Sequence, residues 1–247
     1  MIHAKMASDL RALGIRPDDT ILMHSSLSSL GWVNGGAETV IDTLLDVLSD
    51  GTLLVPALSF SSVTPENPHF SAKETKSCVG AISEYFRKRP GVMRSIHPTH
   101  SVCGIGKHAE AMLSRHLETD TPVGAASPFA LLPEYGGKVL MLGCGLSPNT
   151  SMHGVEELTK PWYLLTDAPM EYTLTDADGK TFKKAYYRHN FHASKAAQRY
   201  SRLADVMEIP SGKVLEATAY LIDAKTMWRV GYETMQQDTD HFIDILS

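Results

Sequence analysis

The stretch from Thr20 to Leu58, TILMHSSLSSLGWVNGGAETVIDTLLDVLSDGTLLVPAL, changes its hydrophobic period in the manner of a βαβ unit. Short β-rich runs occupy 20–25 and 51–58, and the segment 35–49 between them carries an apolar stripe at helical spacing. The residues of that stripe are Val40, Leu44, Leu45 and Leu48. Parallel strands need such a crossover connection, so the stretch predicts two parallel strands joined by a helix.

The same alternation continues more loosely toward residue 145. Helices are predicted at 79–89 and 107–116, and strands at 101–106 and 136–145. The run KVLML at 138–142 is almost entirely apolar, which suits a strand in a sheet that is covered on both faces. We therefore predict an α/β fold, a three-layer α/β/α sandwich with a largely parallel central sheet.

The second half of the chain changes character. Residues 169–187 contain two alternating runs around Asp176-Ala177-Asp178-Gly179, which predicts an antiparallel β-hairpin excursion in the C-terminal half. A helix is predicted at 193–206, a strand at 213–224 and a helix at 223–238. Because no internal repeat or low-complexity linker is found, residues 1–247 are interpreted as a single domain.

The composition is that of a folded, soluble protein. Of the 247 residues, 43% are hydrophobic and 21% are charged, and no run approaches the roughly 18 apolar residues of a membrane span. The N-terminal stretch lacks the apolar block of a signal peptide, so we expect a cytoplasmic protein without a membrane partner. Three cysteines without a CxxC pair predict neither a disulfide framework nor a thiolate zinc site. The net charge of −5 argues against a nucleic-acid partner and is compatible with a cationic small molecule.

Polar groups follow the first predicted strand, in the segment HSSLSSLGWVNGG from His24 to Gly36. Ligands of open α/β sheets collect beyond the carboxyl ends of the strands, and hydroxyls with the N–H groups of a helix start can hold an anion. The spacings of a P-loop and of GxGxxG do not occur here. The segment is either a ligand-binding loop or a serine-rich turn that caps the next helix.

The segment SIHPTHS at 95–101 concentrates ligand-capable groups just before a predicted strand. Pro98 disfavours a helical conformation of His97, so His97 and His100 are not aligned by one helical turn and no metal site is predicted on them. Either one histidine is a satisfied buried residue and the other a surface residue, or residues 99–101 line a cleft.

The most informative segment is LSPNTSMHGVEELTK at 146–160, which follows a predicted core strand. Asn149 or Thr150 is a good N-cap, and on the helix that follows His153 and Glu156 are i,i+3 neighbours on one face. A carboxylate beside an imidazole fixes its tautomer and raises its basicity, as a general base near neutral pH requires. The alternative is a solvated helix face, but the position beyond a core strand favours a site.

Three parts of the chain together resemble the aminoglycoside 3-N-acetyltransferase family, which is distinct from the GNAT acetyltransferases. They are MHSSLSSLGWVNGGAETVIDTLLDVL with GTLLVPALSFS, then RSIHPTHSVCGIGKHAEAML, then TPVGAASPFALLPEYGGKVLMLGCGLSPNTSMHGVEE. They match in order and spacing and cover most of residues 20–160. The resemblance implies an α/β sandwich that moves an acetyl group from acetyl-CoA, a co-substrate, to an amine of a cationic antibiotic, and so gives antibiotic resistance.

The resemblance also implies residue roles, with His153 as the base and Glu156 as its orienting carboxylate. The residues implied to contact acetyl-CoA are His24, Ser25, Ser26, Leu27, Ser28, Ser29, Thr99, His100 and Ser101. Attack of an amine on a thioester needs a neutral amine, a proton acceptor and hydrogen bonds to the oxyanion. His153 can be that acceptor without a covalent enzyme intermediate, and Ser25, Ser26 or Thr99 can be the donors.

After residue 160, the sequence offers no segment that can be aligned with the family. Residues 1–160 are interpreted as the CoA-binding and catalytic part of the domain, and 161–247 as its acceptor-side part. In such enzymes the second part would carry acidic groups for a polyamine. The candidates are Glu157, Asp176, Asp178, Glu233, Asp238 and Asp240. An aminoglycoside or another amine is thus the expected partner, and whether the chain forms a homodimer is left open.

Two other classes of protein stay open from the sequence. One is a metal-dependent hydrolase that uses His97, His100 and His153, and the other is a non-catalytic CoA-binding protein.

Overall fold

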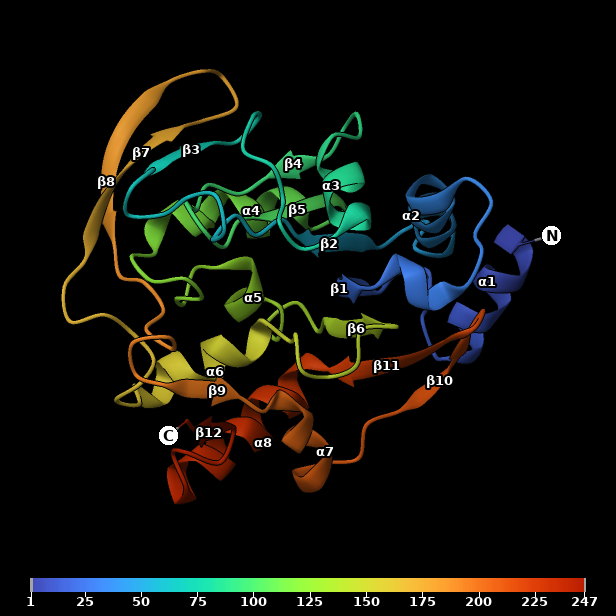
Figure 1. Cartoon of the computed structure of the whole chain (residues 1–247). Coiled ribbons are helices and arrows are strands. Elements are labelled where there is room, and N and C mark those ends of the chain that lie inside the picture. Colours follow the sequence, from blue (N-terminus) through green and yellow to red (C-terminus); the bar gives the residue numbers. More distant parts are fainter. Residues whose placement is uncertain (1, 247) are drawn as a thin grey trace.

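The computed structural model describes residues 2–246. Within them, a seven-stranded sheet has the strand order β10-β11-β6-β1-β2-β5-β4 (Figure 1). Its strands are β1 (Thr20–Ser25), β2 (Thr52–Pro56), β4 (Met93–Arg94), β5 (Val102–Gly106), β6 (Lys138–Leu142), β10 (Ser211–Val214) and β11 (Ala217–Asp223). β1 pairs in parallel with β2 and with β6, and α2 (Gly36–Val47) is the crossover helix that the βαβ pattern predicts.

The antiparallel pairings lie toward the two edges of the sheet. β5 is antiparallel to β2 and β4, and β11 is antiparallel to β6 and β10. Strands β10, β6, β1, β2 and β4 therefore share one direction, so the sheet is largely parallel in strand direction, as predicted. The looser βαβ repeat does not extend to β5, because that strand runs back from the carboxyl end of β2, with Pro56 opposite Val102 and Thr52 opposite Gly106.

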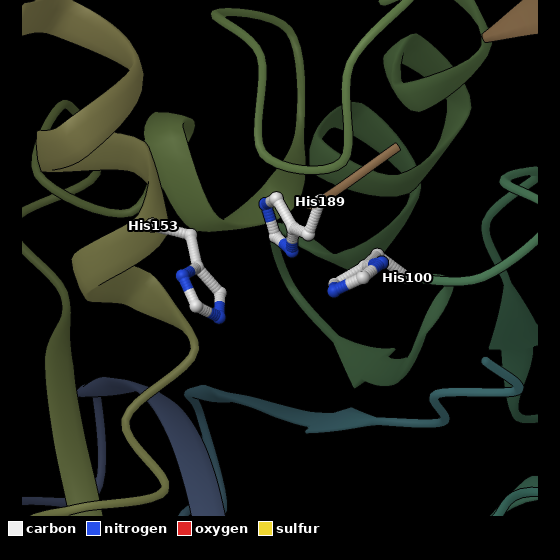
Figure 2. A group of neighbouring side chains, drawn as sticks. All are labelled: His100, His153 and His189. Atoms are coloured by element: carbon white, nitrogen blue, oxygen red, sulfur yellow. The ribbon is translucent and has the colours of Figure 1, made fainter. Parts of the chain in front are cut away.

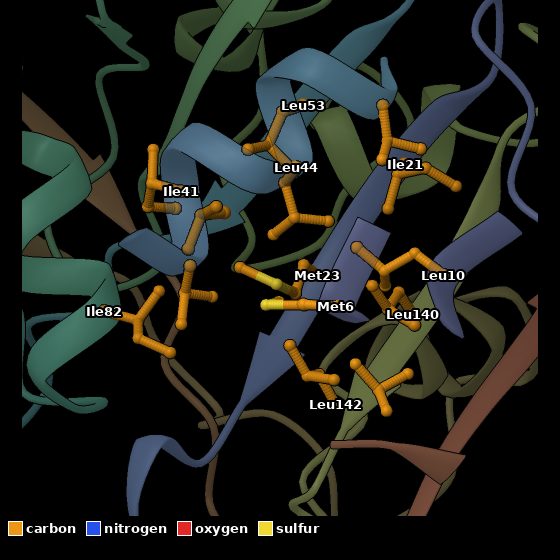
Figure 3. Packing of buried hydrophobic residues seen from close by; sticks show 14 of the residues in the cluster. Met6, Leu10, Ile21, Met23, Ile41, Leu44, Leu53, Ile82, Leu140 and Leu142 are labelled. Atoms are coloured by element: carbon orange, nitrogen blue, oxygen red, sulfur yellow. The ribbon is translucent and has the colours of Figure 1, made fainter. Parts of the chain in front are cut away.

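Helices cover both faces of the sheet. Successive strand residues point to opposite faces, so in β1 Ile21 and Met23 enter one core while Leu22 enters the other. Burial of each such side chain contributes about 1.5–3 kcal/mol. The first face is covered by α1 (Ile2–Ala12), α2 and α3 (Ala81–Arg87). Figure 3 shows Met6 and Leu10 of α1 packed with Leu44 of α2 over the strand residues.

The opposite face is covered by five helices within the described residues. They are α4 (Ala109–Leu113), α5 (Pro128–Leu131), α6 (Ser151–Thr159), α7 (Leu203–Val206) and α8 (Ala224–Gln237). Short 3₁₀ turns lie at η1 (Leu27–Leu30), η2 (Ser114–Glu118) and η3 (Tyr200–Arg202). With the sheet between the two helical layers, the molecule is the predicted three-layer α/β/α sandwich.

The predicted hairpin is also present. β7 (Met170–Thr175) and β8 (Thr181–Tyr186) pair antiparallel, and the Asp176 carboxylate accepts the N–H groups of Asp178 and Lys180 in the turn. β3 (His69–Ser71) adds to β7 in parallel and completes a small second sheet. Figure 1 shows this hairpin at the end of the molecule opposite α1.

Two predictions for the second half are wrong. The segment 193–206 is not one helix, because β9 (Ala196–Gln198) pairs with β12 (Ile243–Ile245), and this distant partner overrides the local helix propensity. The segment 213–224 is not one strand but the end of β10, a turn at Leu215 and β11. Leu215 has a φ of 53°, and its N–H donates to the Asp9 carboxylate at 3.0 Å, which fixes the turn.

The predicted helix at 223–238 is confirmed as α8, whose first turn is capped by Asp223. Among residues 2–246, none of the helices combines the length and the apolar character that crossing a membrane requires.

Candidate active site

A cavity of about 740 Å³ opens at the carboxyl ends of the central strands. His24 and Ser25 at the end of β1, Pro56 at the end of β2 and Cys144 after β6 all line it. This is the place where ligands bind in open α/β sheets, so the cavity lies where the sequence predicted a ligand site.

Helix α6 brings the predicted His153 and Glu156 to this cavity. It begins at Ser151, whose N–H donates to the side-chain oxygen of Asn149 at 3.2 Å. Gly154 lets α6 approach α8 closely, because a Cβ at that position would lie 2.3 Å from the Trp228 ring. The position of His153 therefore depends on the packing of α6 against α8.

His153 and Glu156 contact each other directly. Nδ1 of His153 lies 3.0 Å from Oε2 of Glu156, and the Glu156 side chain is fully buried. Two tyrosines complete the arrangement. The Tyr200 hydroxyl lies 2.6 Å from Nδ1 and donates to Oε2 at 2.7 Å, and the Tyr163 hydroxyl donates to Oε1 at 3.0 Å.

These contacts fix the tautomer of His153. Burial, followed by the charge of Glu156, raises the pKa of Tyr200 well above its usual value, and the pKa of Tyr163 is raised for the same reasons. Both phenols are therefore neutral donors to the carboxylate. With Glu156 accepting, Nδ1 must carry the proton, and Nε2 keeps its lone pair. Within residues 2–246, Nε2 makes no hydrogen bond, and His153 lines the cavity.

Further histidines surround His153. His100, from the loop before β5, and His189, from the loop after β8, lie beside it (Figure 2), with ring centroids of His153 and His189 4.2 Å apart. Burial, followed by repulsion from His153 in its protonated form, lowers the pKa of His24 to about 3 and also lowers the pKa values of His100 and His189. These three imidazoles are therefore neutral at pH 7.

The segment 95–101 meets each predicted alternative only in part. His97 is fully buried, and its Nδ1 accepts the N–H groups of His100 at 2.9 Å and Thr99 at 3.2 Å, so it holds the turn. His100 lines the cavity and is only 6% exposed, so the prediction of a surface histidine is wrong. Ser101 is buried and donates to the Ala57 carbonyl at 2.9 Å, which gives it a structural role.

The candidate co-substrate residues divide into two groups. His24, Ser25 and His100 line the cavity. The other candidates lie outside its described lining; they are Ser26, Leu27, Ser28, Ser29, Thr99 and Ser101. The Ser26 hydroxyl contacts that of Ser29 at 2.9 Å in the η1 turn, and the Thr99 hydroxyl orients His100 through Nδ1 at 2.8 Å.

Among the acidic candidates, Glu157 lies nearest to the site. Its carboxylate accepts the Val123 N–H at 2.8 Å and the Thr121 hydroxyl at 2.5 Å, and lies 3.9 Å from Nε2 of His189. Burial raises the pKa of Glu157 to about 7.

Three of the other acidic candidates are engaged elsewhere within the described chain. Asp176 shapes the β7–β8 turn, Glu233 pairs with Arg229 along α8 at 2.9 Å, and Asp238 accepts the N–H of Asp240 at 3.1 Å beyond the end of α8. None of these three belongs to the described lining of the cavity.

Sequence reasoning missed Tyr163, Tyr200 and His189. Tyr200 lies in the segment wrongly predicted as a helix, and His189 is held by an isolated bridge to Leu165. No spacing in the sequence connects these residues to α6. The single clue was the unusual density of aromatic residues and histidines at 186–192.

The fold and the site together define a class of protein: an α/β sandwich with a carboxylate-oriented imidazole facing a ligand cavity at its strand ends. The chain belongs to the aminoglycoside 3-N-acetyltransferase family, whose model matches residues 22–236.

Known relatives agree with this assignment. The aminoglycoside N(3)-acetyltransferase VII of Streptomyces paromomycinus is 37% identical over 63% of this chain, and the match spans 60% of the relative's length. The crystal structure of the YokD protein from Bacillus subtilis superposes with a TM-score of 0.82 at 28% identity, covering 96% of this chain and 99% of that one. The structure described as AAC-IIIb binary with CoASH has a TM-score of 0.80 at 25% identity, covering 95% and 96%.

Proposed function

We propose that the protein transfers an acetyl group from acetyl-CoA to an amino group of an aminoglycoside, with His153 as the general base, and thereby inactivates the antibiotic. The observation that carries the proposal is the placement of His153, which lines the cavity and has no hydrogen bond to Nε2 among the described residues while Nδ1 is held by the buried Glu156. Membership of the aminoglycoside 3-N-acetyltransferase family supports the type of reaction.

The reaction needs no covalent enzyme intermediate. The lone pair of the amine nitrogen forms a bond to the thioester carbon as the carbonyl π electrons move to oxygen, and Nε2 takes the proton from the nitrogen. Collapse of the tetrahedral intermediate restores the carbonyl and breaks the C–S bond. The leaving sulfur then receives the proton from the imidazolium. Glu156 stabilises that imidazolium through Nδ1 while it exists.

The cavity also supports the binding of acetyl-CoA. Apolar side chains of Leu58, Phe60 and Val79 line it beside the polar His24 and Ser25, a mixture that suits the pantetheine end of CoA. The CoASH complex of a relative with the same fold supports the choice of co-substrate. Of the three predicted oxyanion donors, Ser25 is the one that lines the cavity, and we assign it this role.

A second acceptor class is favoured by one observation. Within the described residues, the cavity lining contains no aspartate, glutamate, lysine or arginine. An amine with fewer charges than an aminoglycoside suits such a lining better than a polycation does, because an unpaired buried charge is costly. Such an amine would be acetylated by the same residues.

The test is thiol release from acetyl-CoA across a panel of aminoglycosides and simple amines, with mass spectrometry of the products. We expect His153→Ala to lower turnover by about 10²-fold or more while acetyl-CoA still binds. His69→Ala on β3 is the matched control, because it removes an exposed histidine that is not part of the described cavity lining. Turnover of His153→Ala close to that of the wild type would exclude His153 as the base.

A further inference from the structure

Three imidazoles converge in the cavity from separate parts of the chain. His100 comes from the loop before β5, His153 from α6 and His189 from the loop after β8 (Figure 2). One ring nitrogen of each lies within 4.8 Å of the corresponding nitrogens of the other two. The reaction proposed above uses only one of these rings as a base and leaves the purpose of the cluster unexplained.

The spacing of the three rings is close to that of a metal site. Zinc binds histidine nitrogen at about 2.0–2.1 Å, which places two nitrogens of a tetrahedral site about 3.4 Å apart. The ring centroids lie 4.2 Å apart for His153 and His189, 4.8 Å apart for His100 and His189, and 6.2 Å apart for His100 and His153. Small rotations of the rings would bring all three nitrogens to bonding distance of one ion. A water or another small ligand would complete the tetrahedron.

The hydrogen bonds leave the right nitrogens free. Nδ1 of His153 is held by Glu156 and Nδ1 of His100 is bonded to the Thr99 hydroxyl, so Nε2 is the nitrogen of each ring that is left for a metal ion. Such bonds to the second nitrogen are what orient histidine ligands in metal sites. Nε2 of His189 is buried and has no hydrogen-bond partner among the described residues, so it lacks the contact that a buried polar atom requires.

The surrounding charges also favour a cation. Burial lowers the pKa values of His100 and His189, and the carboxylate of Glu156 lies 3.0 Å from Nδ1 of His153. Glu157 lies 3.9 Å from Nε2 of His189. A divalent ion between the rings would therefore be partly neutralised by two acidic side chains within one helical turn of each other. Imidazole ligands select borderline ions such as Zn²⁺ over Mg²⁺ or Ca²⁺.

We propose that His100, His153 and His189 form a binding site for one Zn²⁺ ion, and that the bound ion inhibits the protein. Inhibition follows because the ion takes the lone pair of His153 Nε2 that otherwise accepts the proton. This second half of the proposal rests on the proposed acetyltransferase function, whereas zinc binding itself does not.

Zinc binding is tested first, by calorimetric titration of chelator-treated wild-type protein with Zn²⁺. We expect the wild type to bind one Zn²⁺ ion per chain with a dissociation constant of about 1 µM or tighter, and not to bind Mg²⁺. His189→Gln and His100→Gln should each bind zinc at least 10-fold more weakly. His69→Gln is the control that should bind as the wild type does. Should a variant fold poorly, titration of the wild type with Co²⁺ decides whether the histidines bind a metal ion. Bound Co²⁺ absorbs visible light intensely when nitrogen ligands hold it in a tetrahedral site. No stoichiometric binding, or binding unchanged in both variants, would overturn the proposal.

Inhibition is measured next, as acetyl transfer at increasing free Zn²⁺, each protein being compared with its own zinc-free rate. We expect half-inhibition of the wild type near the dissociation constant, reversal by chelator, and at least 10-fold more zinc for half-inhibition of His189→Gln. Full activity of the zinc-loaded protein would refute the inhibitory role. If no amine is acetylated at all, the proposed function fails, while the titrations still decide whether the metal site exists.

Discussion

The two tyrosines that contact Glu156 provide a matched pair of perturbations. Tyr200→Phe and Tyr163→Phe each remove one hydroxyl that donates to the same buried carboxylate, at 2.7 Å and 3.0 Å. Only Tyr200 also contacts the imidazole, with its oxygen 2.6 Å from Nδ1 of His153. The two variants should therefore affect stability alike and turnover differently.

The magnitudes follow from these contacts. A hydrogen bond to a charged group contributes about 1.5–3 kcal/mol, so each variant should lower Tm by about 3–12 °C. When His153 becomes an imidazolium, its charged Nδ1–H donates more strongly to the Tyr200 oxygen and to Glu156 than the neutral ring does. Loss of that acceptor, at about 0.5–1.5 kcal/mol, should lower kcat by about 2- to 13-fold in Tyr200→Phe. Tyr163→Phe should lower kcat by less than about 2-fold on the same argument.

The assay combines thermal unfolding with steady-state thiol release at saturating acetyl-CoA. The KM for acetyl-CoA should change little in either variant, because neither hydroxyl is assigned to co-substrate binding. Equal losses of kcat in the two variants, or a larger loss in Tyr163→Phe, would refute the view that Tyr200 acts through the imidazole.

Three further predictions concern residues that support the site: Glu157, His97 and Gly154. Because burial raises the pKa of Glu157 from 4.5 to about 7, its contribution to stability is complete below pH 4.5 and is lost as the pH rises through 7. Glu157→Gln mimics the protonated form, so the free energy of unfolding of the variant relative to the wild type should rise by up to about 3 kcal/mol between pH 5 and pH 8, with a matching rise in relative Tm. A difference that does not change with pH would contradict this. His97→Ala should cost about 2–4 kcal/mol, because two backbone N–H groups lose their acceptor. His97→Asn should recover part of that loss in denaturant unfolding, and equal losses would exclude the acceptor role. Gly154→Ala should lower both Tm and kcat. Crowding of the new methyl group against Trp228 costs about 1–3 kcal/mol, which outweighs the gain of about 1 kcal/mol in helix propensity. A stabilised variant would contradict the proposed α6–α8 contact.

The sequence was sufficient for those features that are determined locally. His153 and Glu156 lie within one turn of a single helix, so their contact follows from helical geometry once α6 is recognised. The βαβ unit and the β7–β8 hairpin were predictable for the same reason, since each is specified by a short continuous pattern.

The features that depend on distant partners could not be predicted. Tyr200 reaches Glu156 from 44 residues away in the sequence, and its segment has the composition of a helix. Residues 196–198 form a strand instead, because Ile243–Ile245 supplies a pairing partner that no local pattern announces. The reversed direction of β5 was hidden likewise, since a short apolar strand looks the same in either orientation.

The sealed position of Glu156 has a consequence for inhibitor design. A compound that enters the cavity can contact His153 but not the Glu156 carboxylate, which is fully buried and held by Nδ1 of that ring. A tight-binding drug would therefore need a donor or an electrophile aimed at Nε2. Escape from such a drug would have to come from the cavity wall, since loss of Glu156 behind the ring would inactivate the protein along with the drug.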